Sequence, residues 1–383
     1  MNILICGWYG TETLGDRAIL AGILKILGNT FQKGDVNVKI ASLYPFLTKR
    51  TLIEDRNIYV SIAPGLNLTY FDVNNLGVLD REINATDLVV FGGGPIMDLM
   101  ELEVIKYIFI KANKNRKPTA ILGCGLGPLY RKQFKNTAKE ILKHSNLVIF
   151  RDKKSVESSK ELLKDPMIQF NYSHDPAILA GYQYKLHKQE TRGTLKNYIA
   201  VNVRQFQNIG FRADKYVSET KIIELLEDVS KKYGMVKLIP MHTYGIGGDD
   251  RYYLTKLQNE TKSENIEVVH KPMNLYQLFD IYSEAEACIG MRYHSVVFQT
   301  LLNGNNYILD YTDKKNGKIS AFIKLFDTTN FYGDRYINVL EDTPSDKFLE
   351  IKEVLERNKH FNFESYIYEE TLDKYVKLLK SIT

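Results

Sequence analysis

Short apolar runs alternate with amphipathic stretches along almost the whole chain. The apolar runs have the length and β-branched composition of buried strands, and the amphipathic stretches repeat apolar residues every three or four positions, as helices do. Parallel strands need a crossover connection, which is usually a helix. The alternation therefore predicts an α/β protein, with parallel sheets covered by helices on both faces.

The individual elements follow from this pattern. In the first half, the expected strands are Asn2–Cys6, Val38–Ser42, Tyr59–Ile62, Asp87–Phe91, Thr119–Gly123, Leu147–Phe150 and Ile168–Tyr172. The expected helices between them include Arg17–Leu27 and Asn136–His144. In the second half, the expected strands are Tyr198–Val203, Val236–Pro240, Ile266–Val269, Glu286–Gly290, Tyr307–Asp310 and Tyr336–Leu340. The tail, Ser345 to Ile382, is predicted to form one or two amphipathic helices.

The two series of strands predict two domains. A polar segment without apolar periodicity, Tyr182 to Asn197, separates them and is interpreted as a linker. We expect a Rossmann-like domain over residues 1–181, a second over residues 182–344, and a helical segment over residues 345–383 that packs back towards the first. Such doubly wound domains would face a cleft and bind ligands beyond the carboxyl ends of their strands.

The composition is that of an ordinary globular protein, with 44% hydrophobic and 25% charged residues and a net charge of +5. This mild charge suits an anionic small substrate or loose contact with a membrane surface, and it does not indicate nucleic-acid binding. Cys6, Cys124 and Cys288 lie in apolar runs without metal-site spacing, which argues against zinc and against a disulfide framework. Without a signal peptide or an apolar run near the ~20 residues of a membrane helix, we expect a cytoplasmic protein with peripheral contact to the inner face of the cell membrane.

The stretch Ala287 to Gly304 predicts a strand, a turn, and a helix that ends at a glycine. The turn carries Arg292 and His294, where the N–H groups of the new helix are also exposed. A cation, an imidazole and a helix N-terminus together can bind an anionic substrate. A solvated arginine and a packed histidine at a strand–helix junction would give the same pattern, so both interpretations stay open at this point.

Glycine-rich turns follow three of the first strands. They are Gly7-Trp-Tyr-Gly-Thr-Glu-Thr-Leu-Gly-Asp16, Phe91-Gly-Gly-Gly-Pro-Ile-Met-Asp98 and Gly123-Cys-Gly-Leu-Gly-Pro128. None has the spacing of a dinucleotide fingerprint or a P-loop. Glycines at strand ends let the backbone approach a ligand closely, although tight structural turns need them too. Asp16 is expected either to cap the helix that follows or to contact a substrate.

The second half supplies cations at successive strand ends. Arg204, His242 and Lys314 join the Arg292 and His294 pair, and all are expected at one sheet edge. Asp249 and Asp250 are expected to cap a helix rather than to bind a metal. Arg151-Asp152 is a further charged pair, for which a helix-start salt bridge is the alternative.

Taken in order, these motifs resemble the polysaccharide pyruvyl transferase family. The matching residues are Gly10-Thr-Glu-Thr-Leu-Gly-Asp16, Phe91-Gly-Gly-Gly94, Gly123-Cys-Gly-Leu-Gly-Pro128, Arg151-Asp152, Asp175-Pro-Ala177, Gly290-Met-Arg-Tyr-His294, and Tyr311, Lys314 and Gly317. The resemblance extends over roughly residues 1–325. The first motif departs from the family pattern, because Thr13 stands where the family usually has Asn and Arg17 where it usually has Glu.

The resemblance implies transfer of pyruvate from phosphoenolpyruvate onto two hydroxyls of a sugar, as a ketal on a bacterial cell-surface polysaccharide such as a capsule or exopolysaccharide, or on its lipid-linked precursor. It implies a fold like that of the GT-B glycosyltransferases, no metal, and no cofactor beyond phosphoenolpyruvate as co-substrate. His294 would be the catalytic acid/base, and Arg204 and Arg292 would hold the donor. We also expect Arg292 and Asp16 among the catalytic residues and His294 among the donor contacts.

The chemistry of the two substrates extends these assignments. Phosphoenolpyruvate carries two anionic groups, which calls for at least two fixed cations, so we add Lys314 to the donor side as a third cation. Ser295, in the helix start that supplies N–H groups, is also expected on the donor side. On the acceptor side we expect Asp16, Gly10, Gly93, Gly94 and the aromatic face of Trp8. A GT-B glycosyltransferase with a nucleotide-sugar donor and a non-catalytic sugar- or nucleotide-binding protein remain as alternatives.

Overall fold

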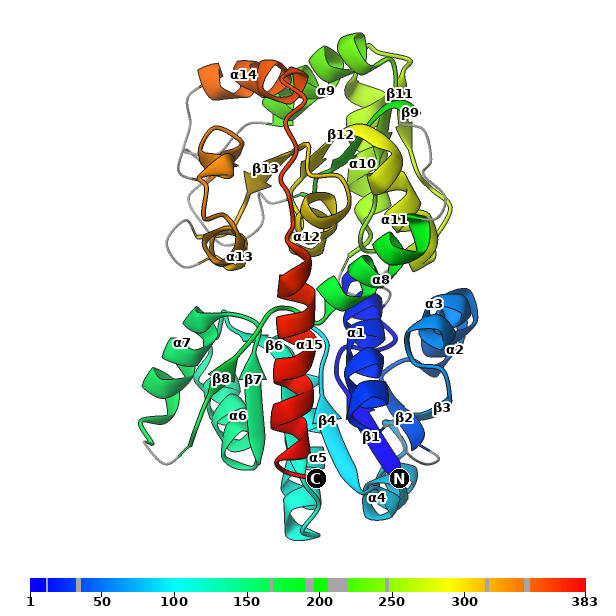
Figure 1. Ribbon diagram of the computed structural model, residues 1–383, viewed down its shortest axis with the longest axis vertical. Coiled ribbons are helices and arrows are strands. Elements are labelled where there is room, and N and C mark those ends of the chain that lie inside the picture. The colour runs from blue at the N-terminus through cyan, green and yellow to red at the C-terminus, as the bar shows by residue number, and fades with distance from the viewer. Residues whose placement is uncertain are drawn as a thin grey trace. The chain divides into compact units, whose positions relative to one another are not determined.

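The computed structural model describes residues 1–11, 13–31, 36–165, 168–189, 196–205, 219–244, 248–313, 317–340 and 345–383. The chain forms two compact units. Unit 1 comprises Met1–Gln183 and Ser365–Thr383, and unit 2 comprises Tyr184–Glu364. Both units are parallel α/β structures (Figure 1).

Unit 1 contains an 8-stranded sheet whose main path runs in the order β3-β2-β1-β4-β6-β7-β8, with β5 paired to β6. All its pairings are parallel. The strands are β1 (Asn2–Cys6), β2 (Val36–Ser42), β3 (Leu66–Asp72), β4 (Leu88–Phe91), β5 (Pro95–Ile96), β6 (Thr119–Leu126), β7 (Leu147–Phe150) and β8 (Asn171–Tyr172). Central strands such as β4 and β7 are buried along their whole length, as expected for a sheet covered on both faces.

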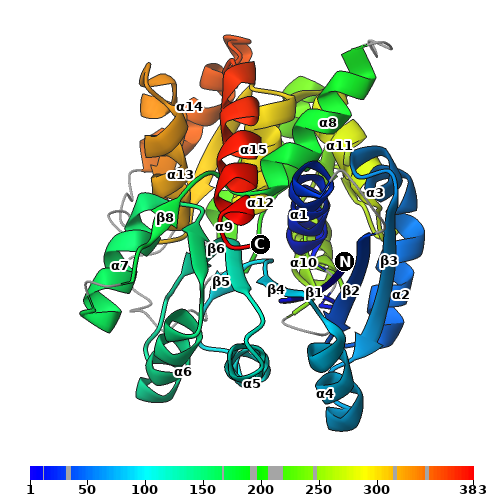
Figure 2. The ribbon, with the colours of Figure 1, turned by 60° about the horizontal axis from the view of Figure 1, so that its bottom comes forward.

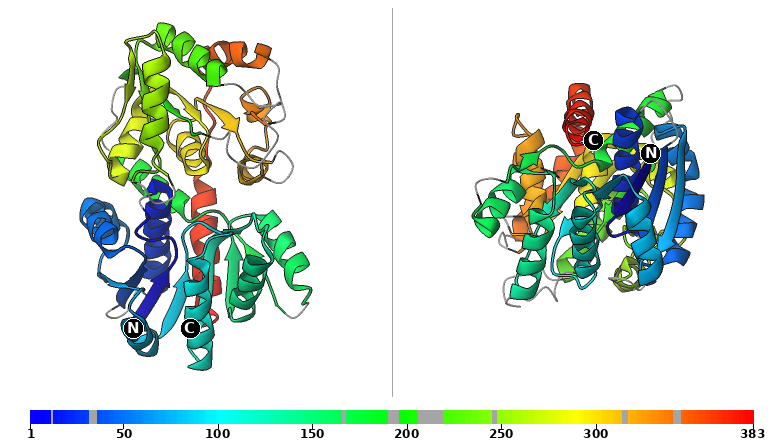
Figure 3. Two further views of the ribbon diagram at one scale, coloured as in Figure 1. Left: turned by 180° about the vertical axis from the view of Figure 1, so that it is seen from behind. Right: turned by 90° about the horizontal axis from the view of Figure 1, so that it is seen from below.

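Helices cover both faces of this sheet (Figures 2 and 3). They are α1 (Leu14–Thr30), α2 (Pro45–Glu54), α3 (Arg56–Ile62), α4 (Leu76–Ala85), α5 (Leu102–Lys114), α6 (Lys132–Lys143), α7 (Lys153–Leu163) and α15 (Ser365–Lys380), with α8 (Ala177–Gln189) crossing the unit boundary. On one face α15 packs against α1 and β7, and on the other α5 packs against α4 and α6. The hydroxyl of Tyr375 in α15 donates a hydrogen bond to the carbonyl of His174 at 2.8 Å.

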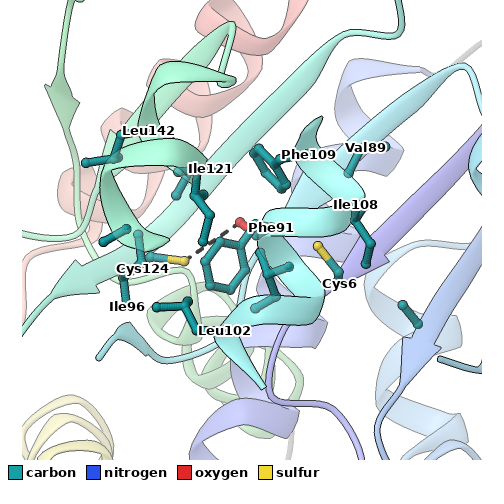
Figure 4. Packing of buried hydrophobic residues seen from close by; sticks show 14 of the residues in the cluster. Cys6, Val89, Phe91, Ile96, Leu102, Ile108, Phe109, Ile121, Cys124 and Leu142 are labelled. Atoms are coloured by element: carbon teal, nitrogen blue, oxygen red, sulfur yellow. Dashed lines mark hydrogen bonds between the residues drawn. The ribbon is translucent and has the colours of Figure 1, made fainter. Parts of the chain in front are cut away.

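The core of unit 1 lies between the sheet and the helices α5 and α6 (Figure 4). Phe91 at the end of β4 packs edge-on against Phe109 of α5, with ring centroids 6.3 Å apart. The thiols of Cys6 and Cys124 belong to the same buried cluster. Burial raises the pKa of both thiols, so they remain protonated side chains of the core.

Unit 2 contains a 6-stranded parallel sheet in the order β11-β10-β9-β12-β13-β14. Its elements are β9 (Lys196–Asn202), α9 (Glu219–Tyr233), β10 (Val236–Leu238), α10 (Asp250–Glu260), β11 (Ile266–Val268), α11 (Leu275–Glu284), β12 (Ala285–Gly290), α12 (Tyr293–Leu302), β13 (Asn306–Asp310), α13 (Lys318–Phe326), the 3-10 helix Phe331–Gly333, β14 (Tyr336–Asn338) and α14 (Ser345–Glu356). Helix α12 packs against α11 and α13, and α9 packs against α14.

Both sheets reverse their strand order at one point. In unit 1 the order turns between β1 and β4, and in unit 2 between β9 and β12. In open α/β sheets the loops at such a point diverge to opposite faces and leave a crevice for a ligand at the carboxyl ends of the strands. These loops contain Gly7–Asp16 and Gly92–Gly94 in unit 1, and Arg204 and Arg292 in unit 2.

The predicted fold class of two Rossmann-like α/β domains is confirmed, and three local predictions are corrected. Tyr59–Ile62 is helical, within α3, and β3 was not predicted. Helix α8 continues to Gln189 and β9 begins at Lys196, so the described residues of the predicted linker belong to a helix and a strand. The predicted C-terminal segment is divided, with α14 in unit 2 and α15 in unit 1. No helix of the described residues is long and apolar enough to cross a bilayer.

Candidate functional site

The loop after β1 enters α1 through a side-chain cap. Thr13 is the N-cap residue, and its hydroxyl accepts a hydrogen bond from the backbone N–H of Asp16 at 3.1 Å. Threonine and asparagine are both good N-cap residues, so Thr13 keeps this role although the family usually has Asn. The cap is therefore Thr13, and not Asp16 as the alternative expectation had it. The Asp16 carboxylate instead accepts a hydrogen bond from the Thr13 hydroxyl.

Glycine is required at two turns of this region. Gly10 has φ +88°, and a β-carbon there would lie 2.8 Å from the carbonyl oxygen of Tyr44. Gly94 has φ +73°, and a β-carbon there would lie 2.4 Å from Trp8 Cδ1 and 3.2 Å from Asp16 Oδ1. The loops after β1 and β4 thus approach each other so closely that larger side chains are excluded.

The loop after β1 and the first turns of α1 form a narrow pocket with β2 and α2. It is lined by Trp8, Tyr9, Gly10, Thr11, Thr13, Asp16, Arg17, Leu20, Ile40, Thr48, Thr51 and Leu52. Gly93 lies beside it, because a β-carbon on Gly93 would be 3.3 Å from the Tyr9 hydroxyl. The predicted acceptor-side residues Trp8, Gly10, Asp16, Gly93 and Gly94 are therefore brought together.

Trp8 and Tyr9 have different surroundings in this pocket. The Trp8 indole N–H donates to the carbonyl of Pro95 at 3.0 Å, and its ring packs edge-on against Phe91. Trp8 is only 4% exposed, so we correct its expected role from an open sugar-stacking face to packing of the loop. The Tyr9 hydroxyl is buried and has no hydrogen-bond partner among the described residues.

Arg17, the second departure from the family pattern, makes a buried ion pair. Its Nε donates to Asp55 Oδ2 at 2.6 Å, and its Nη2 donates to Glu54 Oε2 at 3.1 Å. The side chains of Arg17 and Asp55 are 6% and 0% exposed. Burial alone would lower the pKa of Arg17, but Asp55 raises it above its usual value. Arg17 thus fastens α1 to the junction between α2 and α3.

In unit 2, Arg292 is the N-cap residue of α12. Its backbone N–H donates to Asn202 Oδ1 at 2.9 Å, and its Nε donates to Asp250 Oδ2 at 2.7 Å. Its Nη2 donates to the other oxygen of Asp250, which makes the pair bidentate. Burial would lower the pKa of Arg292, but Asp250 raises it, so the guanidinium stays charged.

Asp250, the first residue of α10, connects α10 with the loop after β10 and with the start of α12. Besides Arg292, its carboxylate accepts hydrogen bonds from the backbone N–H groups of Met241 and His242, at 3.1 and 3.0 Å. Asp249 is the N-cap residue of α10, as predicted, whereas Asp250 orients Arg292. Asn202 and Asp250 are positioning residues that the sequence did not reveal as such, because each acts on a residue distant in the chain.

A second group of cations surrounds Tyr311, at the end of β13. The guanidinium of Arg204 lies 4.9 Å from the centroid of the Tyr311 ring, and its Nη1 donates to the Tyr311 hydroxyl at 3.4 Å. Lys318 Nζ lies 5.9 Å from the same ring and 5.8 Å from that of Tyr293. Lys318 also acts electrostatically on the Asp310 carboxylate, whose pKa burial raises.

The electrostatics of Tyr311 reflect this surplus of positive charge. Burial alone would raise its pKa, but Lys318, Arg204 and Arg292 together lower the pKa of Tyr311 to about 8. A phenol is stabilised as an anion only where positive charge dominates. The loops after β9, β12 and β13 therefore form a site suited to an anionic ligand.

His294 lies in the first turn of α12, next to this site. Its half-buried ring stacks on Phe298 at 6.2 Å and meets Tyr293 edge-on at 5.0 Å. Ser295 was expected to contact the donor, but its side chain does not face the site. It is fully buried, and its hydroxyl bonds Tyr282 at 2.8 Å and Gln299 at 3.0 Å, so its side chain belongs to the packing beneath α12.

A model of the family "Polysaccharide pyruvyl transferase" matches residues 14–314 of the chain. The chain belongs to this family. The match begins at the first residue of α1 and includes Asp16, the glycine turn after β4 and the Arg292–His294 junction. No curated protein sequence matches the chain.

Solved structures with the same fold cover the whole chain. The UDP-GlcNAc 2-epimerase of Methanocaldococcus jannaschii has a TM-score of 0.62 at 12% identity and covers 100% of both chains. The S. aureus MnaA structure with UDP has a TM-score of 0.57 at 12% identity, covering 98% and 97%. Anabaena Alr3699/HepE with UDP and glucose has a TM-score of 0.52 at 11% identity, covering 100% and 95%. At such identities the likeness shows the fold alone.

Further motif residues of this pyruvyl transferase family member have structural roles. Asp152 caps α7 by accepting from Ser155 N at 2.7 Å. Arg151 Nη1 donates to Asp175 Oδ2 at 2.9 Å in a buried pair. Lys314 lies outside the described residues. Lys318, four positions later, was not predicted, although its place at the start of a helix after Gly317 is a recognisable signal.

Proposed function

We propose that this pyruvyl transferase family member moves pyruvate from phosphoenolpyruvate onto two hydroxyls of a sugar and forms a cyclic ketal. The observation that carries the proposal is the cationic site of unit 2, where Arg204, Lys318 and Arg292 act on Tyr311. Phosphoenolpyruvate brings a phosphate and a carboxylate to one small skeleton. The guanidinium groups of arginine and the ammonium group of lysine bind phosphate and carboxylate. The first turn of α12 offers backbone N–H groups to the same ligand.

His294 then serves as the acid/base. Its proton adds to the methylene carbon of phosphoenolpyruvate, which becomes a methyl group and leaves positive charge on C2. One sugar hydroxyl attacks C2 and loses its proton. The bond from C2 to the phosphate oxygen breaks, and phosphate leaves with one proton. The second hydroxyl closes the ketal and returns its proton to the base. Histidine suits such two-way proton transfer near neutral pH.

The narrow pocket of unit 1 is the proposed place of the acceptor. Asp16 offers a carboxylate there, and the buried Tyr9 hydroxyl offers a polar group with no hydrogen-bond partner among the described residues. The acceptor is proposed to be an oligosaccharide or its lipid-linked form, as used in cell-surface polysaccharide synthesis.

Product formation tests the proposal directly. The enzyme is incubated with phosphoenolpyruvate and a panel of galactosides and hexosamines, and phosphate release is followed together with the mass of the sugar. Equal amounts of phosphate and of a pyruvate-bearing sugar are expected. Stabilisation against heat by UDP, with none by phosphoenolpyruvate, would instead favour a nucleotide-sugar-dependent glycosyltransferase.

The ionisation of Tyr311 predicts a pH dependence of donor binding. Below about pH 8 the phenol is neutral, and the cations around it are available to the donor. As the pH rises through this pKa, the phenolate forms, neutralises part of the positive charge and repels the anionic donor. We expect the KM for phosphoenolpyruvate to rise above pH 8, and the Tyr311→Phe variant to lack this rise. An unchanged pH profile in Tyr311→Phe would rule out the phenol as its source.

A further inference from the structure

Helices α2 and α3 of unit 1 present an apolar surface to solvent. Phe46 is 77% exposed, Ile53 66% and Val60 57%. Phe46 and Ile53 are seven residues apart in α2, which is two helical turns, so they lie on one face of that helix. Both helices lie beside β2 and β3 (Figure 2). Side chains of this size are normally buried, and a row of them indicates a surface that is covered in use.

Around these apolar side chains, basic residues are exposed and the acidic residues are buried or paired. Lys49 and Arg56 are exposed between the apolar side chains. The two acidic residues of the same stretch are turned inward, since Asp55 is buried against Arg17 and Glu54 pairs with Arg17 and Arg50. The solvent-facing charge of α2 and α3 is therefore positive. An apolar row with basic neighbours is complementary to an anionic lipid bilayer, where apolar side chains enter the acyl boundary and cations meet the headgroups.

The same helix connects this surface with the narrow pocket. Thr48, Thr51 and Leu52 of α2 line the pocket, while Phe46 and Ile53 point away from the protein on the exposed side. One helix of ten residues, Pro45–Glu54, thus contributes to both features. A sugar attached to a lipid in the bilayer would be within reach of the pocket.

We propose that α2 and α3 form a surface that binds anionic lipid bilayers and places the pocket of unit 1 next to a membrane-anchored acceptor. The proposed binding to lipid bilayers is argued from the exposed residues of α2 and α3 alone. The proposal that this binding brings the pocket to a membrane-anchored acceptor rests on the proposed function.

Sedimentation with lipid vesicles tests the surface without requiring turnover. The full-length protein is mixed with phosphatidylcholine vesicles that contain phosphatidylglycerol, and with vesicles of phosphatidylcholine alone. We expect binding to the anionic vesicles that weakens with added salt. Phe46→Ser/Ile53→Ser should reduce this binding about tenfold or more, because two large side chains lose their apolar contact with the bilayer. Lys49→Glu/Arg56→Glu should reduce it by a similar factor.

Matched controls separate the surface from general effects. Tyr252 in α10 is 81% exposed, so Tyr252→Ser removes an apolar group of similar exposure elsewhere. Lys132→Glu/Lys135→Glu in α6 repeats the charge reversal on another exposed helix face. Both controls should bind vesicles as the wild type does, and all variants should unfold at the wild-type denaturant concentration.

Three results would overturn the proposal. The first is an absence of wild-type binding to anionic vesicles, and the second is equal binding by the wild type and Phe46→Ser/Ile53→Ser. The third is a concentration-dependent dimer that this variant abolishes, since the surface would then bind a second copy of the chain. A loss of vesicle binding with normal transfer to a water-soluble acceptor would support the proposal. Failure of pyruvyl transfer in every variant and in the wild type would refute the proposed function and leave the lipid result intact.

Discussion

Replacing His294 with alanine is expected to lower kcat by roughly 10²- to 10⁴-fold, since a positioned acid/base contributes about that much to a proton-transfer reaction. The KM for phosphoenolpyruvate should change little, because Arg204, Lys318 and Arg292 remain in place. The half-buried ring of His294 packs on Phe298, so the variant also loses a ring contact beneath the site. Steady-state rates over a range of donor concentrations measure both constants.

A second histidine provides the control for this experiment. His270 is exposed in the same unit, and the contact that it makes to Arg251 uses its backbone carbonyl, which alanine retains. His270→Ala should therefore keep the wild-type rate. If correctly folded His294→Ala turned over at a near-normal rate, another group would have to carry the proton.

Replacing Asp55 with alanine is expected to lower the free energy of unfolding by about 3–5 kcal/mol, because it leaves the guanidinium of Arg17 buried without its main partner. The Asp55 side chain is inaccessible to water and that of Arg17 is only 6% exposed, so solvent compensates little for the loss. Urea unfolding followed by circular dichroism measures the change.

The neighbouring carboxylate provides the comparison for this variant. Glu54 is 27% exposed in its side chain, so Glu54→Gln should cost less than about 1 kcal/mol. Arg17→Met/Asp55→Leu should recover most of the stability lost in Asp55→Ala, since a buried ion pair can be replaced by apolar groups of similar size. Equal costs for Asp55→Ala and Glu54→Gln would show that the pair contributes no more than a surface contact.

The sequence was sufficient for the architecture because buried parallel strands have a strong local signal. Runs such as Leu88–Phe91 and Leu147–Phe150 are apolar on both faces, and few other structures suit them. Tyr59–Ile62 was predicted as a strand because its β-branched and aromatic residues favour a strand in isolation. In the folded chain Ile58, Tyr59 and Ile62 are buried at helical spacing, so tertiary packing decides the outcome.

The candidate site was predicted in its motifs but not in its pairings. Arg292 and His294 stand out as a cation and an imidazole at a helix start. Nothing local, however, indicates that Arg292 pairs with Asp250, which lies 42 residues earlier. Lys318 was not predicted, because its approach to the Tyr311 ring depends on how the start of α13 packs against residues after β13. Such choices depend on three-dimensional distances, which periodicity does not contain.

The packing of α15 on α1 and β7 has a consequence for how the protein is made. Unit 1 consists of Met1–Gln183 and Ser365–Thr383, so its last helix is synthesised only after the whole of unit 2. Domains that are continuous in sequence can fold as they leave the ribosome, in order. Unit 1 must instead wait with the surface of α1 and the carbonyl of His174 uncovered until α15 arrives. Unit 1, whose first residues leave the ribosome before any of unit 2, is therefore the last of the two units to finish folding.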